Sequence, residues 1–156
     1  MLVIYGRRIQ GVAYLILGSQ ADAEEVVIDT LVTAWRKGDQ LRDPSALGAW
    51  LVRIAARHAL TRRRRIGATL TLAPEQAERL AGAGAPSIDG VALRDALATL
   101  PPRMRAAVVL HYYADLTVDG VASALERSPN TIKSQLREAL ARLRQQLGEA
   151  PEQSDA

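Results

Sequence analysis

The sequence predicts an all-α protein that consists of two small helical domains joined by a flexible linker. Apolar residues repeat every three to four positions over several long segments, which is the spacing of one buried helix face. The core must be built from Leu, Val, Ile and Ala, because the 156 residues include only two Trp, four Tyr and no Phe. A chain of this length fits one domain or two domains of roughly 60 residues each.

Charge divides the chain into the same parts. Residues 1–66 carry eleven basic and six acidic residues, and residues 92–148 carry eight and five. Between them, residues 67–91 carry one basic and three acidic residues, and the tail 149–156 carries three acidic ones. We therefore predict domains at 1–66 and 92–148, each with a surface that attracts a polyanion, separated by a linker and followed by a tail.

Several classes of function are excluded or not expected. The absence of Cys excludes a disulfide scaffold, a thiol nucleophile and Cys-based zinc sites, and only His58 and His111 remain as imidazoles. His111 and Asp115 lie one turn apart without a third catalytic group, so we expect no enzyme, metal, cofactor or small-molecule substrate. No apolar run reaches the ~20 residues of a membrane span, and no signal peptide pattern is present, so we expect a cytoplasmic protein without membrane insertion.

Two helices are predicted before residue 40. The first covers 5–17, and the second begins with a capping box of Ser19 and Asp22 and stops near Gly38. The predicted buried stripe of the second helix contains Ala23, Val26, Val27, Thr30, Leu31, Ala34 and Trp35. Ile28 and Val32 lie opposite this stripe beside acidic residues. Such a strip fits a site for a protein partner, but more often it packs under another helix.

The third predicted helix starts at Asp43, with Pro44 in its first turn, and runs into four consecutive arginines, Arg62 to Arg65. Its stripe favours a core position for Trp50, with a stacking platform for an unpaired base as the alternative. His58 continues the stripe and is expected to be partly buried and hydrogen-bonded. The arginines either contact phosphate or form a solvated helix end, and the run itself favours neither.

The segment 67–91 is rich in Gly, Pro and Ala and weakly periodic, so we interpret it as a flexible tether, with a short helix possible at 74–80. Helices resume near residue 91. Pro101-Pro102 then breaks the chain, and a further helix runs through Tyr112.

The strongest local signal is a helix-turn-helix over 117–147. Thr117 caps a short helix, Glu126-Arg127 forms the turn, and Ser128 caps a longer helix that ends before Gly148. The core face of the longer helix contains Ile132, Leu136, Leu140 and Leu143. The opposite face contains Asn130, Lys133, Ser134 and Arg137, which can donate hydrogen bonds to base edges or phosphates. From spacing alone, a DNA-reading face and a structural hairpin with a solvated face are equally good interpretations.

Three motifs add information beyond spacing. They are DAEEVVIDT at 22–30 with AWR at 34–36; WLVRIA at 50–55 with the arginines after it; and LPPR at 100–103, YY at 112–113, LT at 116–117, VA at 121–122 and SPNTIKS at 128–134. In this order they resemble the polymerase-binding helix, the promoter-melting helix and the promoter-reading domain of bacterial sigma factors. The linker and length resemble the extracytoplasmic-function (ECF) group, which keeps only sigma regions two and four. The resemblance covers about 5–66 and 92–147.

The resemblance implies a protein that binds core RNA polymerase, recognises a two-part promoter and helps to open the duplex, with an anti-sigma factor as a further partner. It implies polymerase contacts by Glu25, Ile28, Asp29 and Val32. It implies contacts with the melted −10 element by the loop 39–47 and by Trp50, Arg57, Arg62, Arg64 and Arg65. It implies contacts with the −35 duplex by Asn130, Lys133, Ser134 and Arg137, with phosphate contacts by Arg103 and Arg105.

The chain departs from the family pattern at some of these positions. Ile28 stands where Gln is usual on the polymerase face, and Leu47 stands where an aromatic residue is common. Thr61 stands where Asp is common. Glu126 and Arg127 replace a usual Gly and an apolar residue in the helix-turn-helix turn, which predicts a tilted or looser recognition helix.

Two other classes of protein fit parts of the sequence. A free-standing helix-turn-helix regulator would bind duplex DNA as a dimer and would need a dimer seam, but it would need neither the motif at 22–30 nor the basic third helix. A helical adaptor or anti-sigma-like protein would not need a recognition helix. Binding to core polymerase separates the sigma factor from both.

Overall fold

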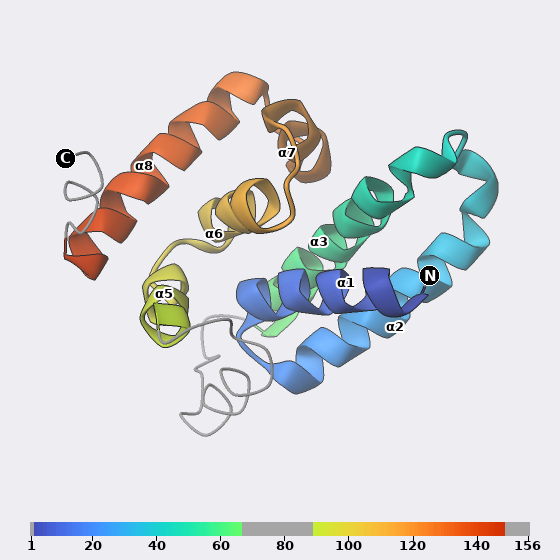
Figure 1. The fold of residues 1–156 in the computed structure, drawn as a ribbon, viewed down its shortest axis with the longest axis horizontal. Coiled ribbons are helices and arrows are strands. Elements are labelled where there is room, and N and C mark those ends of the chain that lie inside the picture. Colours follow the sequence, from blue (N-terminus) through green and yellow to red (C-terminus); the bar gives the residue numbers. More distant parts are fainter. Residues whose placement is uncertain (1, 67–88, 149–156) are drawn as a thin grey trace.

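The computed structural model describes residues 2–66 and 89–148, and every regular element in these two ranges is helical (Figure 1). The prediction of an all-α fold is therefore confirmed. The N-terminal part contains α1 (Leu2–Leu17), α2 (Gln20–Arg36) and α3 (Leu47–Ile66), and each of these helices packs against the other two. Their shared core includes the fully buried side chains of Ile9, Val12, Ile16, Leu17, Val26 and Val52.

The turn between α1 and α2 follows from local sequence. Gly18 adopts a φ of +76°, a left-handed conformation that suits glycine and ends α1. Ser19 then caps α2, because its Oγ accepts a hydrogen bond from the backbone N–H of Asp22 at 3.2 Å. Between α2 and α3, Thr33 Oγ1 lies 2.9 Å from His58 Nε2, so His58 is the half-buried, hydrogen-bonded side chain that its place in the stripe predicts.

The start of α3 differs from the prediction. Asp43 caps a separate 3₁₀ turn, η2 (Pro44–Ala46), and the α-helix begins only at Leu47. The carboxylate of Asp43 accepts hydrogen bonds from the backbone N–H and the hydroxyl of Ser45, at 3.0 and 2.8 Å. The bonds from Ser45 hold the pKa of Asp43 below its usual value. With η1 (Gly38–Gln40), this turn makes the loop between α2 and α3 a structured segment.

The C-terminal part contains α5 (Asp89–Ala98), α6 (Pro102–Val108), a π-helical turn η4 (Val109–Tyr113), α7 (Val118–Leu125) and α8 (Pro129–Leu147). Thr117 caps α7 by accepting a hydrogen bond from the N–H of Gly120 at 3.0 Å, and Ser128 caps α8 through the N–H of Thr131 at 3.1 Å. Gly148 ends α8 with a φ of +79°. The predicted boundaries of the helix-turn-helix pair are thus confirmed.

The two helical parts pack against each other. Helix α3 contacts α6 and α7, and α1 contacts α5, α6 and η4, so that α6 and α7 lie between α3 and α8 (Figure 1). We call this packing the docked arrangement. The sequence did not predict it, and most of the predicted tether, including the possible helix at 74–80, lies outside the described residues.

Candidate nucleic-acid and polymerase interfaces

The outward face of α8 carries the four polar residues that the sequence assigns to duplex DNA. All four are exposed: Asn130, Lys133, Ser134 and Arg137. The opposite face of α8 packs into the core through the buried Ile132, Leu136, Ala139 and Leu143, while Leu140 is half-buried. Within the described residues, none of the four polar side chains forms a hydrogen bond or an ion pair. Their donors therefore point to solvent and can meet base edges or phosphates.

The turn before α8 carries an unusual residue. Glu126 adopts a φ of +56°, in the left-handed region where glycine is favoured. The turn nevertheless keeps its hydrogen bonds, because the N–H of Arg127 donates to the carbonyl oxygen of Ala122 at 3.0 Å. The tilt or looseness of α8 that we predicted from Glu126 and Arg127 stays a prediction.

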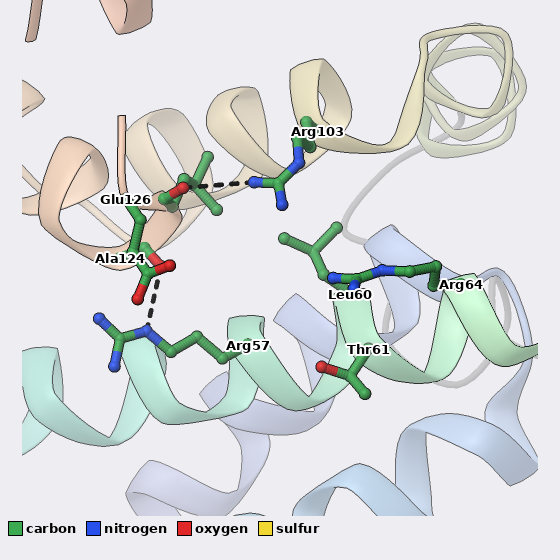
Figure 2. Close-up of a pocket in the computed structure, with 8 residues that line it drawn as sticks. Arg57, Leu60, Thr61, Arg64, Arg103, Ala124 and Glu126 are labelled. Carbon is green, nitrogen blue, oxygen red and sulfur yellow. Dashed lines mark hydrogen bonds between the residues drawn. The ribbon is translucent and has the colours of Figure 1, made fainter. Parts of the chain in front are cut away.

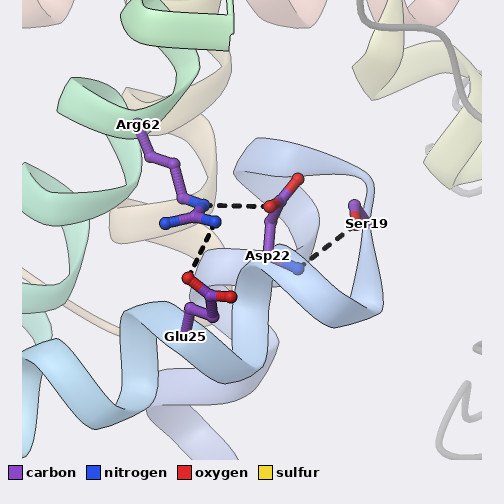
Figure 3. A network of polar contacts seen from close by, with 4 residues as sticks. All are labelled: Ser19, Asp22, Glu25 and Arg62. Atoms are coloured by element: carbon purple, nitrogen blue, oxygen red, sulfur yellow. Dashed lines mark hydrogen bonds and ion pairs between the residues drawn. The ribbon is translucent and has the colours of Figure 1, made fainter.

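The basic end of α3 is partly engaged inside the N-terminal bundle. Figure 3 shows Arg62 between two carboxylates of α2: its Nε lies 2.9 Å from Asp22 Oδ1, and its Nη2 lies 2.9 Å from Glu25 Oε1. The hydrogen bond to Asp22 is the main reason that the pKa of Arg62 is raised. Arg62 and Glu25, assigned to DNA and to polymerase respectively, therefore lie together in one ion-pair network.

A shallow pocket lies where α3 meets the C-terminal part. It has a volume of about 200 Å³ and is lined by Arg57, Leu60, Thr61, Arg64, Arg103, Ala124, Leu125 and Glu126 (Figure 2). Arg57 donates from Nε to the carbonyl oxygen of Ala124 at 3.1 Å and from Nη2 to that of Ser123 at 3.0 Å. A side chain assigned to the melted −10 element is therefore bonded to the last turn of α7.

The two arginines of α6 have different surroundings. Arg103 is half-buried and donates from Nη1 to the carbonyl oxygen of Leu125 at 3.2 Å. Arg105 is only 4% exposed, and the prediction that it contacts phosphate at the surface is wrong for this arrangement. Its guanidinium donates to four carbonyl oxygens at 2.7 to 3.0 Å, those of Ile16, Leu97, Ala98 and Leu100.

The charge of Arg105 is retained despite this burial. Burial first, and the positive charge of Arg63 second, lower the pKa of Arg105 to about 10. The guanidinium is therefore still protonated at neutral pH. Two of its acceptors, the carbonyl oxygens of Ile16 at the end of α1 and of Ala98 at the end of α5, lie in last helical turns, where carbonyl groups lack partners within the helix.

Trp50 packs against the core, as its place in the apolar stripe of the third predicted helix favoured. It is half-buried and packs against the hydrophobic core of the bundle, as Leu47 does one turn earlier. Arg64 and Arg65, farther along α3, are exposed. The aromatic ring of Trp50 is thus held in place by the bundle while part of it remains accessible.

The outer face of α2 carries an exposed apolar strip. Ile28 is 60% exposed, Val32 is 41% exposed and Trp35 is 85% exposed. The prediction that Trp35 belongs to the buried stripe is wrong. The signal that could have placed it correctly is its spacing from Ile28 and Val32, seven and three residues away, which puts all three on one helix face. The expectation that this strip packs under another helix is also wrong.

The part of the chain that the structure describes contains no group of three or more side chains able to hold a metal ion. None of its helices is both long and apolar enough to cross a membrane.

Comparisons with known proteins agree on one family. Residues 2–69 match the family Sigma-70 region 2, and residues 90–143 match the family Sigma-70, region 4. The chain is 31% identical over 142 residues to the ECF RNA polymerase sigma factor SigM of Mycobacterium tuberculosis. This alignment covers 91% of the chain and 72% of SigM. It is 26% identical over 135 residues to the RNA polymerase sigma factor SigV of Bacillus subtilis, covering 86% and 81% of the two chains.

A solved structure matches both helical parts at once. The sigma factor RpoE of Bartonella quintana, determined in complex with the anti-sigma factor NepR, aligns with a TM-score of 0.75 and 25% sequence identity. The alignment covers 94% of this chain and 93% of that one.

Proposed function

The chain belongs to the ECF group of RNA polymerase sigma factors, and from this premise we propose how its surfaces divide the work. An ECF sigma factor directs core polymerase to promoters and starts DNA-templated transcription. The residues that perform these steps in this chain are inferred from exposure, charge and position. We propose domains at 1–66, which contains α1 to α3, and at 92–148, although α5 begins at Asp89, three residues before the second limit.

We propose that the outer face of α2 binds the polymerase. The observation that carries this assignment is the exposed strip of Ile28, Val32 and Trp35, because contiguous apolar surface on a folded helix marks a protein contact. Asp29 and Glu25 form an acidic rim beside it. Trp35 extends the set inferred from the sequence, and its large ring makes it the expected anchor of the contact.

We propose that α3 and the loop before it hold the melted −10 element. Trp50 offers part of a ring on which an unpaired base can stack, and Arg57, Arg62, Arg64 and Arg65 offer positive charge to the backbone of that strand. Bases captured outside the duplex lower the free energy of the melted state relative to the closed one. The chain therefore acts through binding energy, without a catalytic step of its own.

We propose that α8 reads the −35 duplex through Asn130, Lys133, Ser134 and Arg137. Their exposure on one face near the start of a capped helix fits insertion into the major groove. Arg103 is the remaining candidate for a phosphate contact on α6, since Arg105 is buried. The free-standing dimeric regulator finds no support in the comparisons.

We further infer a cytoplasmic location, where polymerase acts, and an anti-sigma factor as a regulatory partner. The second inference is supported by the similarity of both helical parts to a sigma factor that was determined with its anti-sigma factor bound.

A titration against core polymerase tests the assignment of α2. Replacing Trp35 with Ala should weaken binding by about 2 kcal/mol or more, as expected for an aromatic anchor. Asp29→Arg should weaken it by about 1–2 kcal/mol by reversing charge on the rim. Leu147→Ala, which truncates another exposed apolar residue at the end of α8, is the control and should bind like the parent. Unchanged affinity of Trp35→Ala and Asp29→Arg would remove the assignment.

A further inference from the structure

The pocket between α3 and the C-terminal helices is rich in positive charge. Arg57 and Arg64 reach it from α3, and Arg103 reaches it from α6 (Figure 2). Among the described residues that line it, Glu126 supplies the only carboxylate. Within the described ranges, none of these four side chains forms an ion pair. The pocket therefore holds three guanidiniums and one carboxylate, and its surplus positive charge is not neutralised by a neighbouring acidic residue.

Arg62, on the same helix, has the opposite surroundings. Asp22 and Glu25 each place a carboxylate oxygen 2.9 Å from its guanidinium, so its charge is compensated inside the N-terminal bundle. In the part of the chain that the structure describes, no carboxylate does this for Arg57 or Arg64. Repulsion between cations in one small space raises the free energy of the pocket, and an anion bound between them would lower it.

Some donors of the pocket arginines hold them in place, and others have no partner. Arg57 donates from Nε and Nη2 to two carbonyl oxygens in the last turn of α7, and Arg103 donates from Nη1 to the carbonyl oxygen of Leu125. Nη1 of Arg57, Nε and Nη2 of Arg103 and the whole guanidinium of Arg64 form no hydrogen bond with the described residues. Guanidiniums that are already held by backbone bonds lose less conformational freedom when a ligand binds.

The chemistry and the size of the pocket indicate the class of anion. Guanidiniums bind phosphate oxygens through paired N–H···O bonds. The oxygens of a phosphate group point in several directions, so one group can meet cations from α3 and from α6, whereas a carboxylate has two oxygens in one plane. The volume of about 200 Å³ is below the roughly 300–1,000 Å³ of sites for drug-sized ligands. The pocket thus has room for a diphosphate group but not for a whole nucleotide.

We propose that this pocket binds a diphosphate group, either as inorganic pyrophosphate or as the diphosphate end of a nucleotide whose nucleoside stays outside. Its donors are the unpartnered N–H groups of Arg57, Arg64 and Arg103, with the hydroxyl of Thr61 at the wall. The ligand is bound and not converted. The binding does not rest on the proposed function. Its consequence does: because Arg57 and Arg64 are also proposed to contact the −10 strand, a bound diphosphate occupies groups that the strand would use.

Calorimetric titration of the purified chain tests the site with defined anions at low ionic strength and without Mg²⁺. Pyrophosphate should bind once per chain with a dissociation constant of about 1 mM or tighter. Sulfate, a single tetrahedral dianion, should bind about tenfold more weakly because it carries less charge. Thermal unfolding is the second readout, since a ligand of the folded chain raises the midpoint. No saturable binding and no rise in the midpoint, or equal affinity for sulfate, would overturn the proposal.

Two nucleoside probes identify the source of the diphosphate. ADP should bind if the diphosphate end of a nucleotide is accepted, and adenosine, which has no phosphate, should not bind. Affinity for pyrophosphate without affinity for ADP would assign the site to free pyrophosphate. Adenosine that binds as tightly as ADP would mean that the nucleoside is recognised, which would contradict a diphosphate site.

A pair of arginine variants tests the location. Arg64→Gln and Arg65→Gln remove the same charge from neighbouring exposed positions of α3, but only Arg64 lines the pocket. Arg64→Gln should weaken pyrophosphate binding about tenfold through loss of charge-assisted hydrogen bonds. Arg65→Gln should change it by less than about twofold, because water and salt screen an exposed charge outside the site. Equal weakening in both variants would show general attraction to a basic helix end and would overturn the site.

Glu126→Gln tests the same location with the opposite sign. It removes the carboxylate from the pocket wall, so pyrophosphate should bind about threefold more tightly. Unchanged affinity would place the bound anion elsewhere on the chain. Circular dichroism of all three variants shows that their helix content is that of the parent.

The proposed site and the proposed function fail separately. The same preparations are titrated against core polymerase without added anions. A chain that binds pyrophosphate but not core polymerase would contradict the proposed function and leave the diphosphate site assigned. A chain that binds core polymerase but shows no saturable binding of pyrophosphate or ADP would overturn the site alone.

Discussion

The two surfaces that we propose to bind DNA differ in how many of their polar groups already form bonds within the chain. On α8, Asn130, Lys133 and Arg137 point to solvent without partners among the described residues. On α3, Arg57 is bonded to α7 and Arg62 is paired with Asp22 and Glu25. Binding at the first surface requires no protein bond to break, whereas binding at the second exchanges internal bonds for contacts with DNA. The surface proposed for the −35 duplex is therefore available in this state, whereas the surface proposed for the −10 strand would exchange internal bonds on binding.

The largest loss of stability is expected when the buried hydrogen bonds of Arg105 are removed. The change Arg105→Met keeps an unbranched apolar stem but removes the guanidinium, and it leaves the carbonyl oxygens of Ile16, Ala98 and Leu100 without their donor. Relief of the buried charge offsets part of this loss, and we expect the free energy of unfolding to fall by about 3 kcal/mol. Urea unfolding measures it.

Arg103→Met is the control for that substitution, because Arg103 lies on the same helix and, among the described residues, makes one hydrogen bond, to the carbonyl oxygen of Leu125. It should cost about 1 kcal/mol or less. If the free energy of unfolding fell equally in the two variants, the buried hydrogen bonds of Arg105 would stabilise the fold no more than the bond of Arg103.

On the exposed face of α8, two substitutions distinguish contact with bases from contact with phosphate. Arg137 and Lys133 share the exposed face of α8, one turn apart. Arg137→Ala should relax preference at one or two −35 positions, since an arginine bound to guanine contributes about 1–3 kcal/mol of discrimination. Lys133→Ala should weaken all sequences alike and lower the salt slope by about one unit if it binds phosphate. The measurement is binding of each holoenzyme to a randomised −35 library.

Retention of both the parent preference and the parent affinity in these two variants would show that this face does not read the promoter. The turn at Glu126 would then be the first place to look for a re-aimed helix, because its left-handed residue sets the direction in which α8 leaves α7.

The smallest effect is expected at that turn. Glu126→Gly removes the strain of a side chain at a φ of +56° and should raise the free energy of unfolding by about 0.5–1 kcal/mol, after the greater flexibility of glycine in the unfolded chain is counted. Glu126→Gln keeps the strained backbone and removes only the charge. Thermal unfolding of both variants separates the backbone from the charge, and a gain for Gln as large as that for Gly would contradict the role of strain.

Local patterns predicted the elements of this fold well. The stripes of α1 and α8, the caps at Ser19, Thr117 and Ser128 and the stop at Gly148 all depend on residues within a few positions of each other. Trp35 was misplaced because it belongs to two overlapping helical series, one through the half-buried Leu31 and one through the exposed Val32. Near the end of a helix, neighbouring elements decide which series is covered.

The docked arrangement could not be predicted in the same way. The bond from Arg105 to Ile16 spans 89 positions, and that from Arg57 to Ser123 spans 66. No periodicity within one helix reports such a contact, and an arginine at a helix surface has the same local pattern whether it faces water or a carbonyl group. The resemblance assigned Arg57 and Arg105 to DNA, and the sequence carried no sign that both have partners inside the chain.

We propose that the two surfaces act together in the polymerase holoenzyme, with α8 bound to the −35 duplex and α3 bound to the melted −10 strand. Run-off transcription with core polymerase, the purified chain and a library of randomised promoters tests it most directly. We expect transcripts that depend on the chain and whose promoters share two separated motifs, and we expect Arg137→Ala to change only the upstream motif. Transcription that does not depend on the chain, or promoters enriched in a single duplex motif without a −10 element, would contradict it.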